Sequence, residues 1–145
     1  TVSFFWGRPL NKKAKKFEIE VVPSVGVSVG DFTGFSPALH IDAEIGKFEF
    51  YTSSQYSFCA LKPDNSFFFS WSEVLYTVAD RGRLGLALQY TKDCPTKSDE
   101  IKQAPQQIDF GPVGGVEIKR FYLSAYLFNL WSAQRHYAFS LTYNF

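Results

Sequence analysis

The amino-acid sequence predicts an all-β fold, a single antiparallel up-and-down sheet of eight strands that closes into a β-barrel. Three observations carry this prediction. Apolar and polar side chains alternate with period two through most of the chain, as along a strand with two different faces. The segments between these stretches alternate between short turns and longer loops, which a meander of hairpins produces. No run approaches the roughly 18–20 apolar residues of a membrane helix, so any membrane crossing would use strands.

Length and composition set the frame for this fold. The chain has 145 residues, enough for one domain of eight strands, each of which needs about 9–11 residues to cross a bilayer at a tilt. Aromatic residues make up 19% of it, as expected where rings line two membrane–water interfaces. The net charge is only +1, which argues against a nucleic-acid groove. A start at Thr1 without any methionine is what we expect of a mature product whose signal peptide has been removed, or of a trimmed chain.

The first 16 residues differ from the rest. They combine the aromatic triplet at residues 4–6 with four lysines at residues 12–16 and show no period of two. We therefore expect residues 1–16 to be an N-terminal extension and residues 17–145 to form the barrel.

Three strands are predicted in the first half of the barrel. In residues 17–29, valine, isoleucine and phenylalanine alternate with glutamate, serine and glycine. In residues 35–45, apolar side chains alternate with His40, Asp42 and Glu44. The alternation changes phase at residues 46–47, which fits a two-residue hairpin before a third strand from residue 48.

The fourth predicted strand, residues 67–79, contains an exception to its own pattern. Phe67, Phe69, Trp71 and Leu75 define an apolar face, with Ser70, Ser72 and Tyr76 opposite. Glu73 falls on the apolar side. Either a local bulge turns Glu73 inward, or Glu73 contacts a partner protein, because a carboxylate in hydrocarbon costs up to a few kcal/mol.

The second half of the barrel follows the same alternation. Residues 84–91 and 121–127 are clear strands, whereas residues 107–118 are interrupted by Pro112 and two glycines, which favours a kink or bulge. Residues 92–106 contain prolines and charges without an apolar period and are predicted to be the longest loop. The last strand is residues 137–145.

The residue types on the two faces indicate which face points outward. The polar face consists mostly of serine, glycine, alanine and threonine, which fit the crowded inside of a small barrel, whereas the other face carries bulky side chains. A soluble barrel would instead need lysine and glutamate on its outside. The prediction is therefore an eight-stranded antiparallel up-and-down transmembrane β-barrel. A soluble lipocalin-like ligand-binding barrel and a β-sandwich are the alternatives.

The C-terminal strand carries the only resemblance to a known family. Its residues 137–145 read YAFSLTYNF, and this strand resembles the last strand of bacterial outer-membrane β-barrels, which ends in Phe after apolar residues at every second position. The resemblance implies the bacterial outer membrane as location, outer-membrane lipid and the outer-membrane assembly machinery as partners, and a periplasmic side for the short turns and for the extension 1–16. The residues of this assembly signal are Tyr137, Phe139, Leu141, Tyr143 and Phe145.

The inward face is predicted to hold a polar cluster in the lumen. Its members are Glu18, Glu20, His40, Asp42, Glu44, Glu49 and Glu117. Buried charges must be paired or hydrogen-bonded, so we expect these residues to form a salt-bridged interior. His40, Asp42 and Glu44 span roughly 13 Å along one strand, too far for one metal ion to touch all three, and no cofactor is expected.

The predicted function is that of a small, non-catalytic outer-membrane barrel. It would act through its extracellular loops, above all residues 92–106, or through its lipid-facing wall, as a binding or structural protein or an accessory subunit of an outer-membrane complex. The first alternative is a lipid hydrolase or acyltransferase using His136 with Ser124, Ser132 or Ser140, and a channel is the next. Cys59 and Cys94 are expected to form a disulfide on the outer side if the loop carrying Cys94 folds inward.

Overall fold

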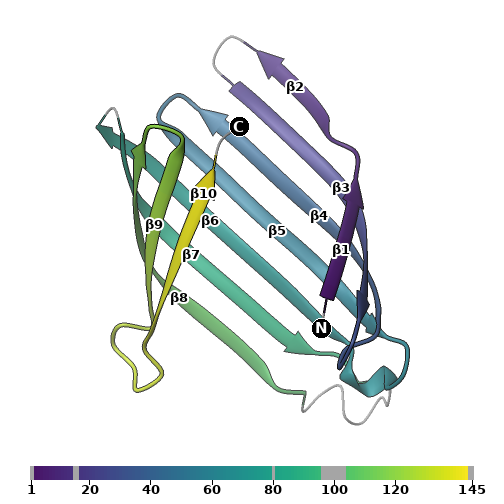
Figure 1. Cartoon of the computed structure of the whole chain (residues 1–145). Helices are drawn as coiled ribbons and strands as arrows, with labels where there is room; N and C mark the ends of the chain where they lie inside the picture. The colour runs from purple at the N-terminus through teal and green to yellow at the C-terminus, as the bar shows by residue number, and fades with distance from the viewer. Residues whose placement is uncertain (1, 15–16, 80, 96–103, 144–145) are drawn as a thin grey trace.

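The structure is a computed structural model that describes residues 2–14, 17–79, 81–95 and 104–143. Figure 1 shows the strands as one long, strongly curved sheet. Within the described residues a single 3-10 turn, η1, is the one helical element. In chain order the elements are β1 (Val2–Gly7), β2 (Leu10–Ala14), β3 (Phe17–Val29), β4 (Gly34–Ile45), β5 (Phe48–Cys59), η1 (Pro63–Asn65), β6 (Phe67–Ala79), β7 (Gly82–Asp93), β8 (Gln106–Ile118), β9 (Phe121–Phe128) and β10 (His136–Tyr143).

The connectivity confirms an antiparallel up-and-down sheet. Neighbours in the sheet follow the order β1, β3, β4, β5, β6, β7, β8, β9, β10, and β2 pairs with β3. The eight predicted strands correspond to β3–β10. The sheet nevertheless has ten strands, and no pairing between described residues joins its two ends. The predicted closed barrel of eight strands is therefore not confirmed by this structure, in which another segment lies on the edge of β3.

That segment is the N-terminal extension. Residues 2–14 run antiparallel to β3, with Val2 opposite Val29 and Ala14 opposite Phe17. Pro9, which has no N–H for the ladder, separates β1 from β2. We expected an extension apart from the sheet, and the structure instead places it along the full length of β3.

The connections alternate in length as predicted. Among β3–β10, short turns join β4 to β5, β6 to β7 and β8 to β9, while longer segments join the other consecutive strands. In Figure 1 the short turns lie at the upper end of the sheet and the longer connections at the lower end. Gly46 and Lys119 take positive φ values of 64° and 60° in two of the short turns, as tight hairpins require.

The two faces of the sheet differ sharply in composition. One face, the outer face, exposes bulky side chains such as Phe35, Leu86 and Phe139. The opposite, inner face holds the buried cluster of Leu75, Ala87, Val113, Tyr126 and Phe128. The small residues of the predicted polar face, Ser36, Ser57 and Ser124 among them, are buried on this inner face.

The orientation of β6 corrects one prediction. Trp71 and Leu75 lie on the inner face, where Trp71 packs against the buried cluster, and Ser70 and Ser72 lie on the outer face. The two serines are not left without partners there, because the Ser70 hydroxyl pairs with that of Ser54 at 2.8 Å and the Ser72 hydroxyl with that of Thr52 at 2.9 Å. The inner face needs aromatic volume to fill it, and this need outweighs the outward placement that side-chain hydrophobicity alone predicts.

The same correction applies to Glu73. Two residues from Trp71, it lies on the inner face as a regular member of β6, and the register shift in this strand falls later, between Thr77 and Ala79. Neither a bulge at Glu73 nor a partner protein is needed to satisfy its charge. The Trp71 indole and the Tyr126 hydroxyl already hydrogen-bond its carboxylate within the chain, and the predicted partner contact stays a prediction.

Candidate functional site in the polar interior

A polar cavity of about 480 Å³ lies against the inner face. Strands β4–β7 line one side of it, and β9 and β10 line the other. Its charged and phenolic lining residues are Asp42, Glu44, Glu49, Glu73, Arg83, Tyr51, Tyr122 and Tyr126.

The register brings most of the predicted lumen cluster together. Glu18 lies directly opposite Glu44, and Glu44 lies opposite Glu49 on the next strand. One step along, Glu20 lies opposite Asp42. Like charges opposite one another on neighbouring strands repel, so this end of the inner face concentrates negative charge.

Two predicted members lie at the margins of this acidic cluster. His40 pairs with Val22 on one side and Ser53 on the other, which places it further along β4. Glu117 belongs to β8 and approaches the cluster through a shared arginine. Among the described residues no three His, Cys, Asp or Glu side chains are close enough to hold a metal ion.

Arg83 is that shared arginine, and sequence reasoning missed it. Its Nε lies 2.8 Å from Glu49 Oε1, and its terminal nitrogen lies 3.8 Å from Glu117 Oε2. Its guanidinium carbon sits 4.8 Å from the centre of the Tyr122 ring, a cation–π contact. The alternation of β7, in which Arg83 precedes outward Leu84, was the available signal for its inward position.

A second cation meets the acidic cluster at its edge. The Lys13 ammonium lies 2.5 Å from the Glu18 carboxylate, and both side chains are largely exposed. The hydrogen bond and the negative charge of Glu18 raise the pKa of Lys13. Lys13 is thus the one lysine of the extension that the structure pairs with a predicted lumen residue in the described part of the chain.

Glu73 lies on β6, on the same side of the cavity as Glu49. Its carboxylate accepts hydrogen bonds from the Trp71 indole N–H and from the Tyr126 hydroxyl, the latter at 2.9 Å. The Trp71 ring packs edge-on against Tyr126 and Phe128, with centroid distances of 5.1 and 5.5 Å. These contacts hold β6 to β9 across the interior, and the alternation pattern does not indicate which side chains of the two strands meet.

A buried carboxylate near the longer connections is fully satisfied. Asp109 is 1% exposed and accepts hydrogen bonds from the side-chain amides of Gln107, at 2.7 Å, and Asn129, at 2.6 Å. Asn129, with a φ of 53°, also accepts the backbone N–H of Phe110 at 3.2 Å. This group fastens the start of the β9–β10 connection to β8, which is a structural role.

The two cysteines are both free in the structure, so the predicted disulfide is not present. Ser66 lies between them. The backbone N–H of Cys59 donates to the Ser66 hydroxyl at 3.1 Å, and that of Cys94 donates to the Ser66 carbonyl at 2.7 Å. The start of β6 therefore lies between Cys59 and Cys94 and is hydrogen-bonded to both.

The geometry around His136 bears on the enzyme alternative. Its Nδ1 lies 3.3 Å from the backbone carbonyl oxygen of Gln134, and its ring stacks on Phe128 at 5.1 Å. Ser124, one of the serines considered as its partner, donates to the Tyr126 hydroxyl instead, at 3.2 Å. His136 and Ser124 therefore contact other residues in this structure and do not form a hydrogen bond with each other.

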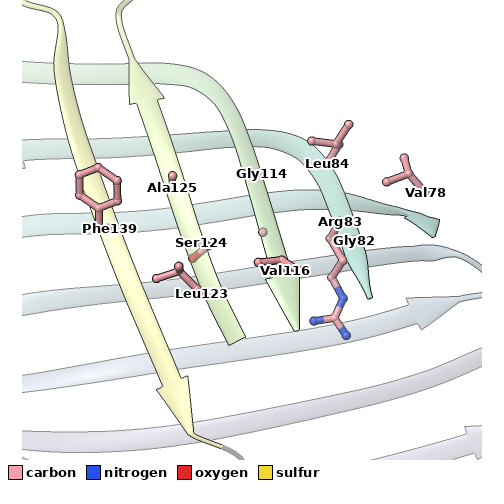
Figure 2. A pocket seen from close by; sticks show the side chains of 11 residues that line it. Val78, Gly82, Arg83, Leu84, Gly114, Val116, Leu123, Ser124, Ala125 and Phe139 are labelled. Carbon is pink, nitrogen blue, oxygen red and sulfur yellow. The ribbon is translucent and has the colours of Figure 1, made fainter. Parts of the chain in front are cut away.

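The predicted assembly strand lies at an end of the sheet. Tyr137, Phe139, Leu141 and Tyr143 all point to the outer face of β10, and Phe139 is 76% exposed. Phe145 lies outside the described residues. Beside Phe139 the outer face has an apolar hollow of about 440 Å³, where Gly114 and Ala125 leave space between larger neighbours (Figure 2).

Comparison with known proteins finds no relative of this chain. No protein-family model matches the sequence, and neither a curated protein nor a solved structure is similar to it. No helix in the described residues is long and apolar enough to cross a membrane.

Proposed function

We propose that this protein is a small, non-catalytic β-barrel of the bacterial outer membrane that acts as a binding or structural protein, or as an accessory subunit of a larger outer-membrane complex. One observation carries the proposal, namely the inverted placement of side chains on the sheet. Bulky apolar groups are exposed on the outer face, whereas the carboxylates and Arg83 gather on the inner face.

A lipid environment gives this inversion a physical reason. Exposed apolar patches beyond a few hundred Å² are rare on soluble monomers, yet all of β3–β10 contribute large exposed side chains to one face. In hydrocarbon those side chains need no cover, and polar groups are best placed inside. A lipocalin-like barrel would need the reverse arrangement, with its bulky residues around an internal cavity.

Contacts with partners would then be made by the outer wall or by the longer connections. In those connections Leu61 and Trp131 are 72% and 88% exposed. Large apolar side chains at loop tips are suited to binding another protein, because they bury much area for little ordering cost. The 92–106 loop, which we predicted to carry binding, is only partly described.

Catalysis is not favoured by the geometry. A hydrolase needs a base held against a nucleophile, and the contacts of His136 and Ser124 go elsewhere. The polar cavity is lined by the hydroxyls of Ser124, Ser140 and Thr142, but none of its lining residues is a histidine that could act as the base, and Ser124 donates its hydrogen bond to a tyrosine.

Tryptophan quenching by brominated lipid tests the proposal directly. With Trp6 and Trp131 changed to Phe, inner-face Trp71 remains as the one tryptophan, and a further Leu88→Trp change adds an outer-face probe at a similar depth on the neighbouring strand. In vesicles of brominated phospholipid, the added probe should be quenched strongly and Trp71 weakly.

The control is the same pair of proteins in vesicles without bromine. A protein that remains in the aqueous fraction without detergent would overturn the proposal. Equal quenching of the two probes would do the same, because it would place the inner face in lipid as well.

A further inference from the structure

The two free edges of the sheet belong to β10 and to residues 2–14, which form β1 and β2 and are called here the N-terminal strand. In Figure 1, β10 and β1 lie on opposite sides of the open front of the curved sheet. We propose that the N-terminal strand and β10 compete for the same edge of β3, and that strands β3–β10 close into an eight-stranded barrel when the N-terminal strand detaches. The inference rests on the membrane barrel proposed above.

Strand direction is the first argument. The N-terminal strand runs antiparallel to β3, and the seven antiparallel pairings from β3 to β10 make β10 antiparallel to β3 as well. The N-terminal strand and β10 therefore run in the same direction, as Figure 1 also shows. Joining them would create a parallel pair in an antiparallel meander, whereas joining β10 to β3 keeps every pair antiparallel, as even-numbered barrels do.

A second copy of the chain does not remove this difficulty. Two copies inserted in a membrane with the same orientation would both present β10 and the N-terminal strand running the same way. Any edge-to-edge contact between them would again be parallel. Replacement of the N-terminal strand by β10 on the edge of β3 closes the sheet and keeps every strand pair antiparallel.

The side chains of β10 match those of β3 face for face. On β10, Tyr137, Phe139 and Leu141 point outward while Ala138, Ser140 and Thr142 point inward. On β3, Val25, Val27 and Val29 point outward while Ser24, Gly26 and Ser28 point inward. Pairing the two strands would extend both faces without a break, and a free hydrogen-bonding edge in hydrocarbon is costly enough to require such a partner.

The side-chain contacts that hold the N-terminal strand on β3 are few: the Ser3 hydroxyl pairs with that of Ser28, and the Phe5 ring lies against Gly26 on the inner face. Phe4 and Trp6 are 69% and 81% exposed on the outer face, so they add little packing. At the Pro9 interruption, Arg8 makes a long backbone hydrogen bond to the Pro23 carbonyl, at 3.3 Å. The ion pair between Lys13 and Glu18 is exposed, and exposed pairs stabilise little.

A reversible lock tests the exchange. Ser3 and Ser28 face each other with their hydroxyl oxygens 2.7 Å apart, so Ser3→Cys with Ser28→Cys should form a disulfide that fastens the N-terminal strand to β3. The matched control is Ser54→Cys with Ser70→Cys, whose hydroxyl oxygens lie 2.8 Å apart between β5 and β6. Both pairs are made with Cys59 and Cys94 changed to Ser and are refolded into detergent micelles.

Two measurements report closure. A closed barrel resists detergent and shifts on a gel when it is boiled, and closure protects the β10 amides from hydrogen exchange. The oxidised variant with Ser3→Cys and Ser28→Cys should show neither the boiling-dependent gel shift nor protection of the β10 amides from hydrogen exchange. Addition of reductant should restore both. The control pair should show both, whether oxidised or reduced.

The opposite change comes from Gly7. A Cβ at this position would lie 2.7 Å from Ser24 Cβ and 2.9 Å from the Pro23 carbonyl oxygen, so Gly7→Val should weaken docking of the N-terminal strand on β3, while the sequence of β3–β10 is unchanged. The fraction of the protein that shows the boiling-dependent gel shift should therefore be larger than in wild type.

The outcomes separate the two proposals. The proposed strand exchange is wrong if the two oxidised double-cysteine variants close equally well. It is also wrong if wild type enters micelles but its β10 amides are never protected from hydrogen exchange. In both cases the membrane proposal stands. If wild type stays soluble without detergent, the membrane proposal itself fails.

Discussion

The hydroxyl of Tyr126 on β9 donates a hydrogen bond of 2.9 Å to the Glu73 carboxylate on β6, across the interior of the curved sheet. The two residues are 53 positions apart in the chain. Their contact, with the packing of Trp71 beside it, holds one wall of the polar cavity to the other.

Removing the Tyr126 hydroxyl should therefore lower stability. In Tyr126→Phe the carboxylate loses a charge-assisted hydrogen bond, and we expect the free energy of unfolding to fall by about 1–3 kcal/mol. Urea unfolding in micelles, followed by Trp71 emission, measures the change.

Tyr122→Phe is the matched control for that variant. The Tyr122 hydroxyl is buried without a hydrogen-bond partner among the described residues, so its removal should leave stability unchanged or slightly higher. An equal loss in both variants would contradict a specific role for the Tyr126 contact.

Arg83 should stabilise the acidic interior. Arg83→Gln leaves Glu49 and Glu117 without their shared cation, and because all three side chains are partly exposed, we expect a loss of about 1–2 kcal/mol at neutral pH rather than the larger cost of a fully buried pair.

Urea unfolding in micelles measures this loss. Neighbouring Arg81→Gln, at an exposed position, serves as the control and should have little effect. An equal loss in both variants would contradict a specific role for the Arg83 contacts with Glu49 and Glu117.

Two glycines of β8 should respond differently to alanine. A Cβ on Gly111 would lie 1.9 Å from the backbone oxygen of Leu127, so Gly111→Ala must push β8 and β9 apart and should cost at least about 1–3 kcal/mol. On the outer face a Cβ on Gly114 would meet only the Leu84 side chain, at 3.2 Å, and Gly114→Ala should cost less than about 1 kcal/mol because it enters the hollow of Figure 2. Thermal unfolding of both variants gives the comparison, and similar losses would contradict the close approach at Gly111.

The thiols should differ in reactivity. Cys59 is 6% exposed, whereas Cys94 is only half-buried, so a maleimide should label Cys94 faster in the folded protein and both equally after unfolding. Mass spectrometry of the protein oxidised in air should find two free thiols. A single Cys59–Cys94 bridge would instead support the disulfide that the sequence suggests.

The amino-acid sequence by itself determined the repeating part of this protein. The period of two along β3, β4, β5, β7, β9 and β10 placed their side chains on the correct faces, because inward and outward positions must alternate along any strand. The positions of the short turns and longer connections followed from the same pattern and from the turn residues between its segments. The acidic cluster was also predictable, since cross-strand register in short hairpins follows from the turn length.

Only the tertiary structure decided what depends on contacts between distant segments. Trp71 and Glu73 face inward because the interior needs volume and Tyr126 supplies a donor, neither of which is visible in the sequence of β6 alone. Arg83 became the shared partner of Glu49 and Glu117 only when β5, β7 and β8 were brought together. The N-terminal strand lies on β3 for the same reason: a free strand edge accepts whichever segment can pair with it, and the local pattern of residues 1–16 does not specify that choice.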